Sequence, residues 1–236
     1  MNPLLHYLSG KVLIVAMTLR WLLPTSAQAQ STLNRVLQEQ VLKVGLINDR
    51  HHYHLTGDGP TGFDYGYARG LSDYLGVTLQ VVPFYSEVNL YQALTNNKIH
   101  IAAPRFRPAA LKPELAHGPV LFTTTLVELG PENDASPCST TAPQQRLVLP
   151  YIQGTVTAIT GIDWQQSASA YSVTLLTQML SQADFCTILP STWRAALTRY
   201  FPTLNEQVLP DTTLTKQWLV RAEDTALLST LYEFTH

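Results

Sequence analysis

Charged residues are scarce in this sequence, and long apolar runs are missing. Asp, Glu, Lys and Arg together make up 14% of the 236 residues. Because Lys and Arg form no run, no basic stripe could follow a phosphate backbone, and we expect no nucleic acid partner. The one apolar run near the start is interrupted by Arg20 and falls short of the about 20 residues that a membrane-spanning helix needs.

The motifs of the common catalytic classes are also missing. The sequence has no Gly-x-Ser-x-Gly elbow, no His-Glu-x-x-His pair and no glycine-rich phosphate loop. Neither Cys138 nor Cys186 has a histidine nearby in sequence that could activate its thiolate. We therefore expect no enzyme and no cofactor, although residues far apart in sequence could still assemble a site.

The first 29 residues have the features of an export signal. Lys11 precedes the apolar run Val12–Met17, and Ala27-Gln28-Ala29 has the small-x-small pattern of a cleavage site. We expect a cleavable signal peptide over residues 1–29 and a mature chain that starts at Gln30 in the periplasm. The alternative is an uncleaved membrane anchor.

The sequence has two cysteines that could form a disulfide, and three of its seven histidines lie close together. Cys138 and Cys186 both lie in the exported part, where a disulfide is permitted, but one buried and one exposed thiol is an open alternative. His51, His52 and His54 could bind a transition metal. They lack the dispersed fourth ligand and acidic neighbours of a dedicated site, so we expect no metal.

The stretch from Leu42 to Phe84 organises the first half of the chain as strand, loop, helix and strand. The apolar runs Leu42–Ile47 and Val77–Phe84 predict the strands, and the polar segment Asp49–Gly59 predicts the loop. Asp64 can cap the start of the helix and Gly76 can end it. Apolar side chains recur in this helix at helical spacing, at Tyr65, Ala68, Leu71 and Leu75.

The same alternation continues on both sides of this stretch. We expect a leading helix over Ser31–Gln40, another helix over Val88–Asn97 and a buried strand over Ile99–Ala103. Strands that alternate with helices favour a parallel sheet with right-handed crossovers, which is the α/β class. Ligands of such sheets bind at the carboxyl ends of the strands, so a cleft should be lined by the loops after Ile47, Phe84 and Ala103.

The second half predicts further elements around a linker. A long strand over Leu121–Leu129 leads into Gly130–Gln145, which is polar, contains proline and has no periodicity. We then expect a strand, a helix, a strand, a helix, a strand and a last helix, over Arg146–Ile152, Ala170–Gln182, Asp184–Leu189, Ser191–Tyr200, Gln217–Arg221 and Thr225–Phe234.

The residues of the first half resemble a known family. Gly-Phe-Asp-Tyr at residues 62–65, followed by Ala-Arg-Gly-Leu-Ser-Asp-Tyr-Leu-Gly-Val from Ala68, resembles the first lobe of bacterial solute-binding protein family 3. The longer stretch over residues 42–84 is similar to the solute-binding domain at the front of membrane-bound lytic transglycosylase F, a family of peptidoglycan-cleaving enzymes. The resemblance is dense over residues 33–131 and thinner over residues 146–234.

The resemblance implies a two-lobed periplasmic binding protein-like fold of the α/β class. Each lobe is expected to be a mainly parallel sheet flanked by helices, and crossing strands join the lobes. Lobe one is expected over residues 30–125 with a return segment over residues 213–236, the crossing strand end and linker over residues 126–145, and lobe two over residues 146–212. We expect no glycan-cleaving domain, because its general acid is a glutamate followed by serine and the sequence has no Glu-Ser dipeptide.

The resemblance also implies where a ligand would bind, and the sequence departs from the family at the main clamps. Family members hold the carboxylate of an amino acid with an arginine and its ammonium group with an aspartate, and Leu111 and Leu189 stand in those places here. Lys112, Arg105 and Arg107 lie close enough in sequence to supply a cation instead.

Other positions match the family better. An aromatic residue in the first loop covers the ligand, which points to Tyr53, and Asp64 is retained as a ligand contact or only as a helix cap. Gly154-Thr155 matches a turn that holds an anionic group at a helix start. The candidate ligand-binding residues are therefore Tyr53, Asp64, Arg105, Phe106, Arg107, Gly154 and Thr155.

We predict from this a periplasmic solute-binding protein-like module that closes two lobes on a small solute. With both clamps replaced, a free α-amino acid would bind weakly, and a larger solute that is less charged or anionic at one end would bind better. The partners would be that solute and a membrane transporter or a cell-wall enzyme, and we expect a monomer. The alternative is a non-catalytic regulatory or scaffolding remnant of a transglycosylase front domain that acts on cell-wall partners.

Overall fold

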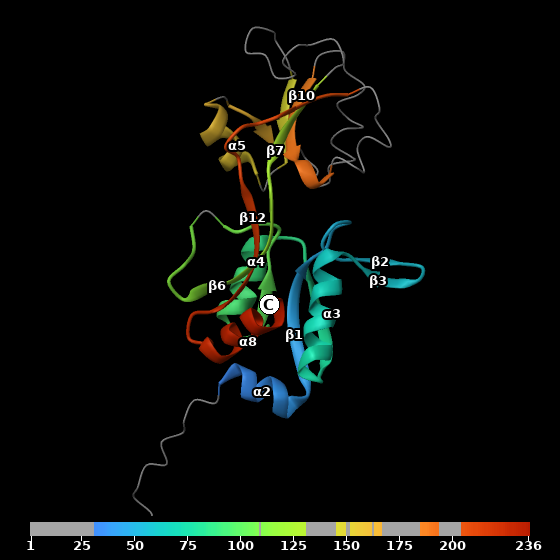
Figure 1. Cartoon of the computed structure of the whole chain (residues 1–236), viewed down its shortest axis with the longest axis vertical. Coiled ribbons are helices and arrows are strands. Elements are labelled where there is room, and N and C mark those ends of the chain that lie inside the picture. The colour runs from blue at the N-terminus through green and yellow to red at the C-terminus, as the bar shows by residue number, and fades with distance from the viewer. Residues whose placement is uncertain are drawn as a thin grey trace, which may run out of the picture. The chain divides into compact units, whose positions relative to one another are not determined.

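The structure is a computed structural model, which describes residues 31–108, 110–130, 145–149, 152–161, 163–166, 185–193 and 204–236 (Figure 1). The predicted signal peptide, most of the predicted linker, Cys138 and the helix expected over Ala170–Gln182 lie outside the described residues. Among the helices that are described, none is long and apolar enough to span a bilayer.

The first sheet has the strand order β4-β1-β5-β12-β6. Its strands are β1 (Val41–Ile47), β4 (Thr78–Phe84), β5 (Ile101–Ala103), β6 (Leu115–Thr124) and β12 (Leu214–Arg221). Strand β1 runs parallel to β4 and β5, whereas β12 is antiparallel to β5 and β6. The helices α3 (Phe63–Leu75) and α4 (Glu87–Thr95) form the crossovers that the parallel strands require. With α2 (Thr32–Glu39) and α8 (Thr225–Thr235), this sheet makes up lobe one.

The second sheet has the strand order β11-β7-β10-β8-β9. Its strands are β7 (Leu126–Gly130), β8 (Gln145–Val148), β9 (Gln165–Gln166), β10 (Phe185–Pro190) and β11 (Asn205–Val208). Strands β8, β9 and β10 run parallel, and β7 is antiparallel to β10 and β11. With α5 (Gln153–Thr160) and the 3₁₀ turn η1 (Ser191–Trp193), this sheet makes up lobe two. In each sheet four of the five strands therefore run in the same direction, with β12 and β7 as the antiparallel strands, and the predicted α/β class with mainly parallel sheets is confirmed.

Two segments connect the sheets. Only Thr125 separates β6 of the first sheet from β7 of the second, so the single strand predicted over Leu121–Leu129 is in fact two strands. The return runs from β11 into β12, and the backbone N–H of Leu126 donates to the hydroxyl of Thr212 at 3.0 Å where the two segments meet. The crossing is thus held by polar contacts, while the exact lobe boundaries stay a prediction.

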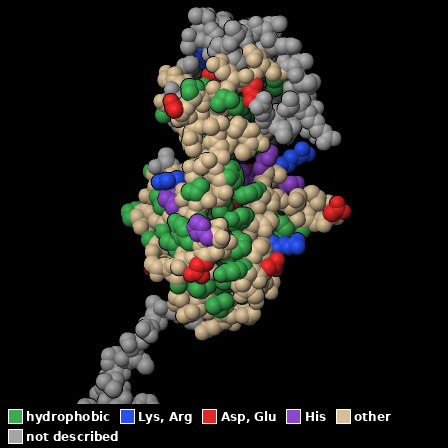
Figure 2. Space-filling view, in the orientation of Figure 1, with side chains coloured by type: hydrophobic (Ala, Val, Ile, Leu, Met, Phe, Trp, Pro, Cys, Tyr) green, Lys and Arg blue, Asp and Glu red, His purple; other side chains and the backbone are tan. Residues whose placement is uncertain are grey.

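Apolar side chains of the first sheet alternate between two clusters. Ile101 and Ala103 of β5 pack in a cluster with Leu71 of α3 and with residues of α8, whereas Ala102 packs in a cluster with Leu90 of α4. Because successive side chains of a strand point to opposite faces, helices cover both faces of this sheet. On the face of the molecule that Figure 2 shows, charged side chains are few and scattered, as the low charged content implies.

The loop predicted over Asp49–Gly59 contains a small hairpin. Strands β2 (His54–Thr56) and β3 (Gly59–Thr61) pair in antiparallel register around the turn at Gly57-Asp58. The Thr56 hydroxyl donates to the Gly59 carbonyl oxygen at 2.8 Å. Three residues per strand are too few for the alternating pattern that marks a strand in sequence, so the hairpin was not predicted.

Helix α3 begins against the loop that follows β1. The N–H group of Phe63 donates to the carbonyl oxygen of His51 at 2.8 Å, and that of Asp64 donates to the carbonyl oxygen of His52 at 3.1 Å. These bonds satisfy N–H groups that the first turn of a helix leaves without partners. The N-cap residue is Gly62, no side chain caps the helix, and the predicted capping role of Asp64 is wrong.

The two glycines that flank α3 both need a positive φ. Gly76 ends the helix in the left-handed conformation with φ 66°, as predicted. Gly62 has φ 124°, and a Cβ atom added there would lie 2.4 Å from the carbonyl oxygen of His52. The close approach of α3 to the loop after β1 therefore depends on glycine at position 62.

Gly62→Ala should lower the free energy of unfolding by about 2 to 4 kcal/mol, because the side chain meets backbone and the φ angle is strained. Gly66→Ala is the matched control, since a Cβ there meets no atom within 4 Å. It should raise stability by about 0.5 to 1 kcal/mol, because alanine favours a helix interior more than glycine does. Urea unfolding of the three proteins measures both changes, and equal effects of the two substitutions would contradict the fold at this point.

Candidate ligand-binding site

A pocket of about 410 Å³ lies at the carboxyl ends of strands of the first sheet. It is lined by His51, His52, Phe63, Phe106, Phe122, Thr192 and Trp193. The two histidines follow β1 and Phe106 follows β5, which agrees with two of the three loops predicted to line a cleft. The loop after Phe84 adds none of the lining residues. Thr192 and Trp193 come from η1 of lobe two, so both lobes contribute to the pocket.

Aromatic rings from the two lobes meet in this pocket. The imidazole of His51 stacks on the indole of Trp193, with ring centroids 4.6 Å apart and an interplanar angle of 9°. Phe63 meets Phe122 edge to face at a centroid distance of 5.1 Å. Burial lowers the pKa of His51 against the opposing effect of the Asp49 charge. A flat, apolar surface is therefore the main feature that the pocket offers to a ligand.

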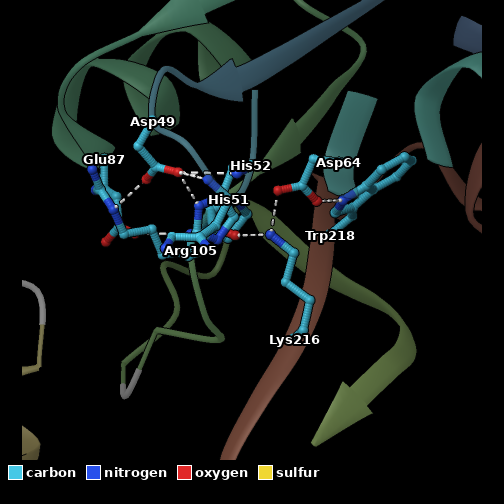
Figure 3. A network of polar contacts seen from close by, with 9 residues as sticks. Asp49, His51, His52, Asp64, Glu87, Arg105, Lys216 and Trp218 are labelled. Carbon is cyan, nitrogen blue, oxygen red and sulfur yellow. Dashed lines mark hydrogen bonds and ion pairs between the residues drawn. The ribbon is translucent and has the colours of Figure 1, made fainter. Parts of the chain in front are cut away.

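The carboxylate of Asp49 contacts both histidines of the pocket wall and Arg105 (Figure 3). One of its oxygens accepts the backbone N–H groups of His51 and His52 at 3.0 and 2.9 Å and contacts Nδ1 of His52 at 2.6 Å. The other accepts Nε of Arg105 at 3.1 Å. Burial alone would raise the pKa of Asp49, but the hydrogen bonds and charges of His52 and Arg105 hold it well below its usual range. Asp49 is therefore ionised.

Arg105 does not present its charge to the pocket. Its side chain is 6% exposed and pairs with Asp49, and its backbone N–H donates to the carboxylate of Glu87 at 3.0 Å. The sequence predicted that Arg105 could replace the missing carboxylate clamp. That prediction overlooked Asp49, which lies 56 residues away in sequence and already neutralises the guanidinium.

The other candidates near Arg105 have separate environments. Phe106 lines the pocket and packs against the apolar core of lobe two. Arg107 is exposed, and its backbone N–H donates to the carbonyl oxygen of Thr215 at 2.7 Å. Leu111, which stands in the place of the family arginine, packs partly buried against the cluster beside α4. Lys112 is exposed and does not line the pocket.

Asp64 is a buried structural residue in this fold. Its carboxylate accepts Nζ of Lys216 at 2.7 Å and Nε1 of Trp218 at 2.8 Å, and both members of the ion pair are 0% exposed (Figure 3). Lys216 also donates to the carbonyl oxygen of Pro104. Burial lowers the pKa of Lys216, and the charge of Asp64 opposes this shift. Asp64 is too enclosed for the ligand contact that its motif suggested.

Tyr53, Gly154 and Thr155 do not line the pocket. Tyr53 is 9% exposed and packs in the core of lobe one beside Tyr65, at a ring centroid distance of 6.1 Å, whereas we expected an exposed ring. Gly154 and Thr155 lie in the first turn of α5. The prediction that these three residues hold the ligand is therefore not supported by their positions.

Lobe two buries the remaining positions that the sequence singled out. Leu189, in the place of the family aspartate, is fully buried in its core. Cys186 is buried in β10 and is disulfide-bonded. Because Cys138 lies outside the described residues, the Cys138–Cys186 pairing stays a prediction. Among the residues that the structure describes, no group of three or more His, Cys, Asp and Glu side chains could hold a metal ion.

Sequence comparison relates the chain to part of a longer protein. No family model matches it. It is 28% identical over 204 residues to "Membrane-bound lytic murein transglycosylase F" of Shewanella sp. (strain W3-18-1), an alignment that covers 83% of this chain and 43% of the relative. The chain thus spans less than half the length of this relative.

Structure comparison gives the fold. An ancestral amino acid-binding protein, described as a precursor of cyclohexadienyl dehydratase, superposes with a TM-score of 0.71 at 17% identity, over 87% of this chain and 92% of that one. A histidine-bound ABC uptake transporter substrate binding protein from Streptococcus pneumoniae also has a TM-score of 0.71, at 12% identity, over 88% of this chain and 90% of that one.

The fold is therefore that of the two-lobed periplasmic binding proteins. Within this class, the chain is homologous to the N-terminal domain of membrane-bound lytic murein transglycosylase F. The resemblance that the sequence predicted is confirmed.

Lys216→Met should lower the free energy of unfolding by about 3 to 5 kcal/mol, because it leaves the Asp64 carboxylate buried without its cation. Asp64→Asn should cost a similar amount. The double variant should cost less than the sum of the two, since neither charge is then left unpaired. Lys112→Met, which removes an exposed lysine, is the control and should change stability by less than about 0.5 kcal/mol. Urea unfolding gives all four values, and additive costs would contradict the pairing.

Proposed function

We propose that this chain is a binding module that holds a small, uncharged solute with a flat apolar face in the aromatic pocket. The observation that carries the proposal is the pairing of Arg105 with Asp49, which removes the buried cation beside Phe106 from ligand binding. The module would act in the periplasm after removal of residues 1–29. A location outside the cytoplasm is in keeping with relatives that are named membrane-bound.

The charges around the pocket support an uncharged ligand. None of the described residues that line it is Asp, Glu, Lys or Arg. Lys216, the other buried cation of this region, is neutralised by Asp64. A free amino acid would therefore bring a carboxylate and an ammonium group into a desolvated site without partners, and each such group costs several kcal/mol.

The lining supports a flat ligand. Phe63, Phe106, Phe122 and Trp193 offer ring faces and edges, and such rings gain most from contact with another planar or apolar surface. The volume of about 410 Å³ lies within the range that small-molecule pockets usually have. Because Gly154 and Thr155 do not line the pocket, the proposal no longer includes the anionic end that the sequence suggested.

A second candidate function is a regulatory or scaffolding module for cell-wall partners. It is favoured by the homology to part of a murein transglycosylase and by the stack of His51 on Trp193. In this stack the two ring faces already contact each other without a ligand between them. In this case the pocket would need no ligand, and the partner would be a cell-wall enzyme. In the first case the partner of the loaded module would be a membrane transporter.

A thermal-shift screen can separate these candidates. Uncharged planar compounds such as indole, adenine and nicotinamide are compared with the free proteinogenic amino acids. A ligand at about 100 times its dissociation constant adds about 2.7 kcal/mol, which raises the melting temperature by about 5 to 10 °C for a chain of this size. We expect such a rise for at least one planar compound and for no amino acid.

Two variants make the screen specific to the pocket. Trp193→Ala should abolish the shift, because it removes a wall of the pocket. Tyr232→Ala, which removes an exposed aromatic side chain on α8, should leave the shift intact. A rise with a free amino acid that Trp193→Ala abolishes would contradict the proposal. If no compound raises the melting temperature and the protein binds tightly to a purified cell-wall enzyme, the second candidate is favoured.

A further inference from the structure

Among the described residues that line the pocket, His52 is the one whose side chain a buried carboxylate holds in place. Its Nδ1 lies 2.6 Å from Oδ1 of Asp49, and its backbone N–H donates to the same oxygen at 2.9 Å. Its neighbour His51 contributes only its backbone N–H to that oxygen. The orientation of the His52 ring is therefore fixed by its contact with Asp49 (Figure 3).

The charge of Asp49 also decides which ring nitrogen carries the proton. An ionised carboxylate has no proton to donate, so the short contact at Nδ1 requires N–H on that nitrogen. In the neutral ring Nε2 then carries a lone pair. The Asp49 contact thus keeps the proton on Nδ1, and when the ring is neutral Nε2 can only accept a hydrogen bond.

Nε2 lies on the edge of the His52 ring that does not contact Asp49. It makes no hydrogen bond to any residue that the structure describes, and it is not among the described polar atoms sealed away without a partner. His52 itself lines the pocket. His52 is thus a pocket-lining ring whose orientation Asp49 fixes. The other described lining side chains are aromatic rings, the imidazole of His51 among them, and the hydroxyl of Thr192.

We propose that His52 makes the pocket selective for planar, uncharged ligands that carry a ring N–H or O–H group, as indoles and phenols do. The inference rests on the proposed function and adds the polar contact that such a pocket needs for specificity. A ligand with this donor satisfies Nε2, whereas a ligand without it leaves a desolvated lone pair unpaired. If the Asp49–His52 contact only braced the loop after β1, ligands with and without the donor would bind alike.

Two isomers of methylindole test this directly. 3-Methylindole keeps the ring N–H and 1-methylindole lacks it, while size and apolar surface are nearly equal. Ligand-observed NMR titration of the wild-type protein gives both dissociation constants. We expect 3-methylindole to bind about 3- to 10-fold more tightly, the ratio that one hydrogen bond supplies.

Variants assign the preference to His52. His52→Phe keeps a flat ring but removes Nε2, so the two isomers should bind equally. His54→Phe is the matched control, because His54 belongs to the same loop and does not line the pocket. It should keep the full preference for 3-methylindole. The wild-type comparison needs no variant and decides the question even if His52→Phe does not fold.

The outcomes separate this inference from the function on which it rests. Equal binding of both isomers to the wild-type protein would overturn the role of His52 and leave the aromatic binding module in place. A preference that His52→Phe retains would likewise overturn that role. If neither isomer binds and no planar compound raises the melting temperature, both the role of His52 and the aromatic binding module are overturned.

Discussion

The structure around the pocket depends on one carboxylate, that of Asp49. It contacts the backbone and ring of His52 and neutralises Arg105, which joins the loop after β1 to the loop after β5. Because these loops belong to neighbouring parallel strands, one buried anion fixes the floor of the cleft. The Asp49 carboxylate also pairs with Arg105, the cation that the sequence offered for a carboxylate ligand. A chain with the fold of amino acid-binding proteins thus presents a pocket without a charged clamp.

The buried ion pair between Asp64 and Lys216 likewise neutralises a cation inside lobe one. Asp64 at the start of α3 meets Lys216 on β12, so the helix that follows the first loop is tied to the strand that returns from lobe two. Taking both charges out of water is expensive, and their attraction compensates only with additional hydrogen bonds, which Trp218 and Pro104 supply. In both pairs the acid and the base neutralise each other inside the protein, which leaves aromatic rings to line the pocket.

Periodicity predicted β1, α3, β4, α4 and β5 of lobe one within a few residues, because β1 and β5 are buried apolar runs and the helices have apolar faces. The bounds of β6 and the hairpin β2–β3 were not predicted, because their sequences have no such pattern. Gly76 ended α3 as predicted. The site was less predictable. Arg105 pairs with Asp49, 56 residues away, and Asp64 pairs with Lys216, 152 residues away. No local sequence pattern predicts such pairs. Two signals were nevertheless present: an acid, Asp49, directly after a strand of a parallel sheet, and a lysine, Lys216, in a strand otherwise rich in apolar residues.

Asp49 holds Arg105 away from any ligand in this structure. The most direct test is a crystal structure of the protein grown in a large excess of free histidine or arginine. We expect Nε of Arg105 to stay 3.1 Å from the Asp49 carboxylate and no amino acid to be ordered in the pocket. Arg105 released from Asp49 and bound through its guanidinium to the carboxylate of the amino acid would contradict this expectation.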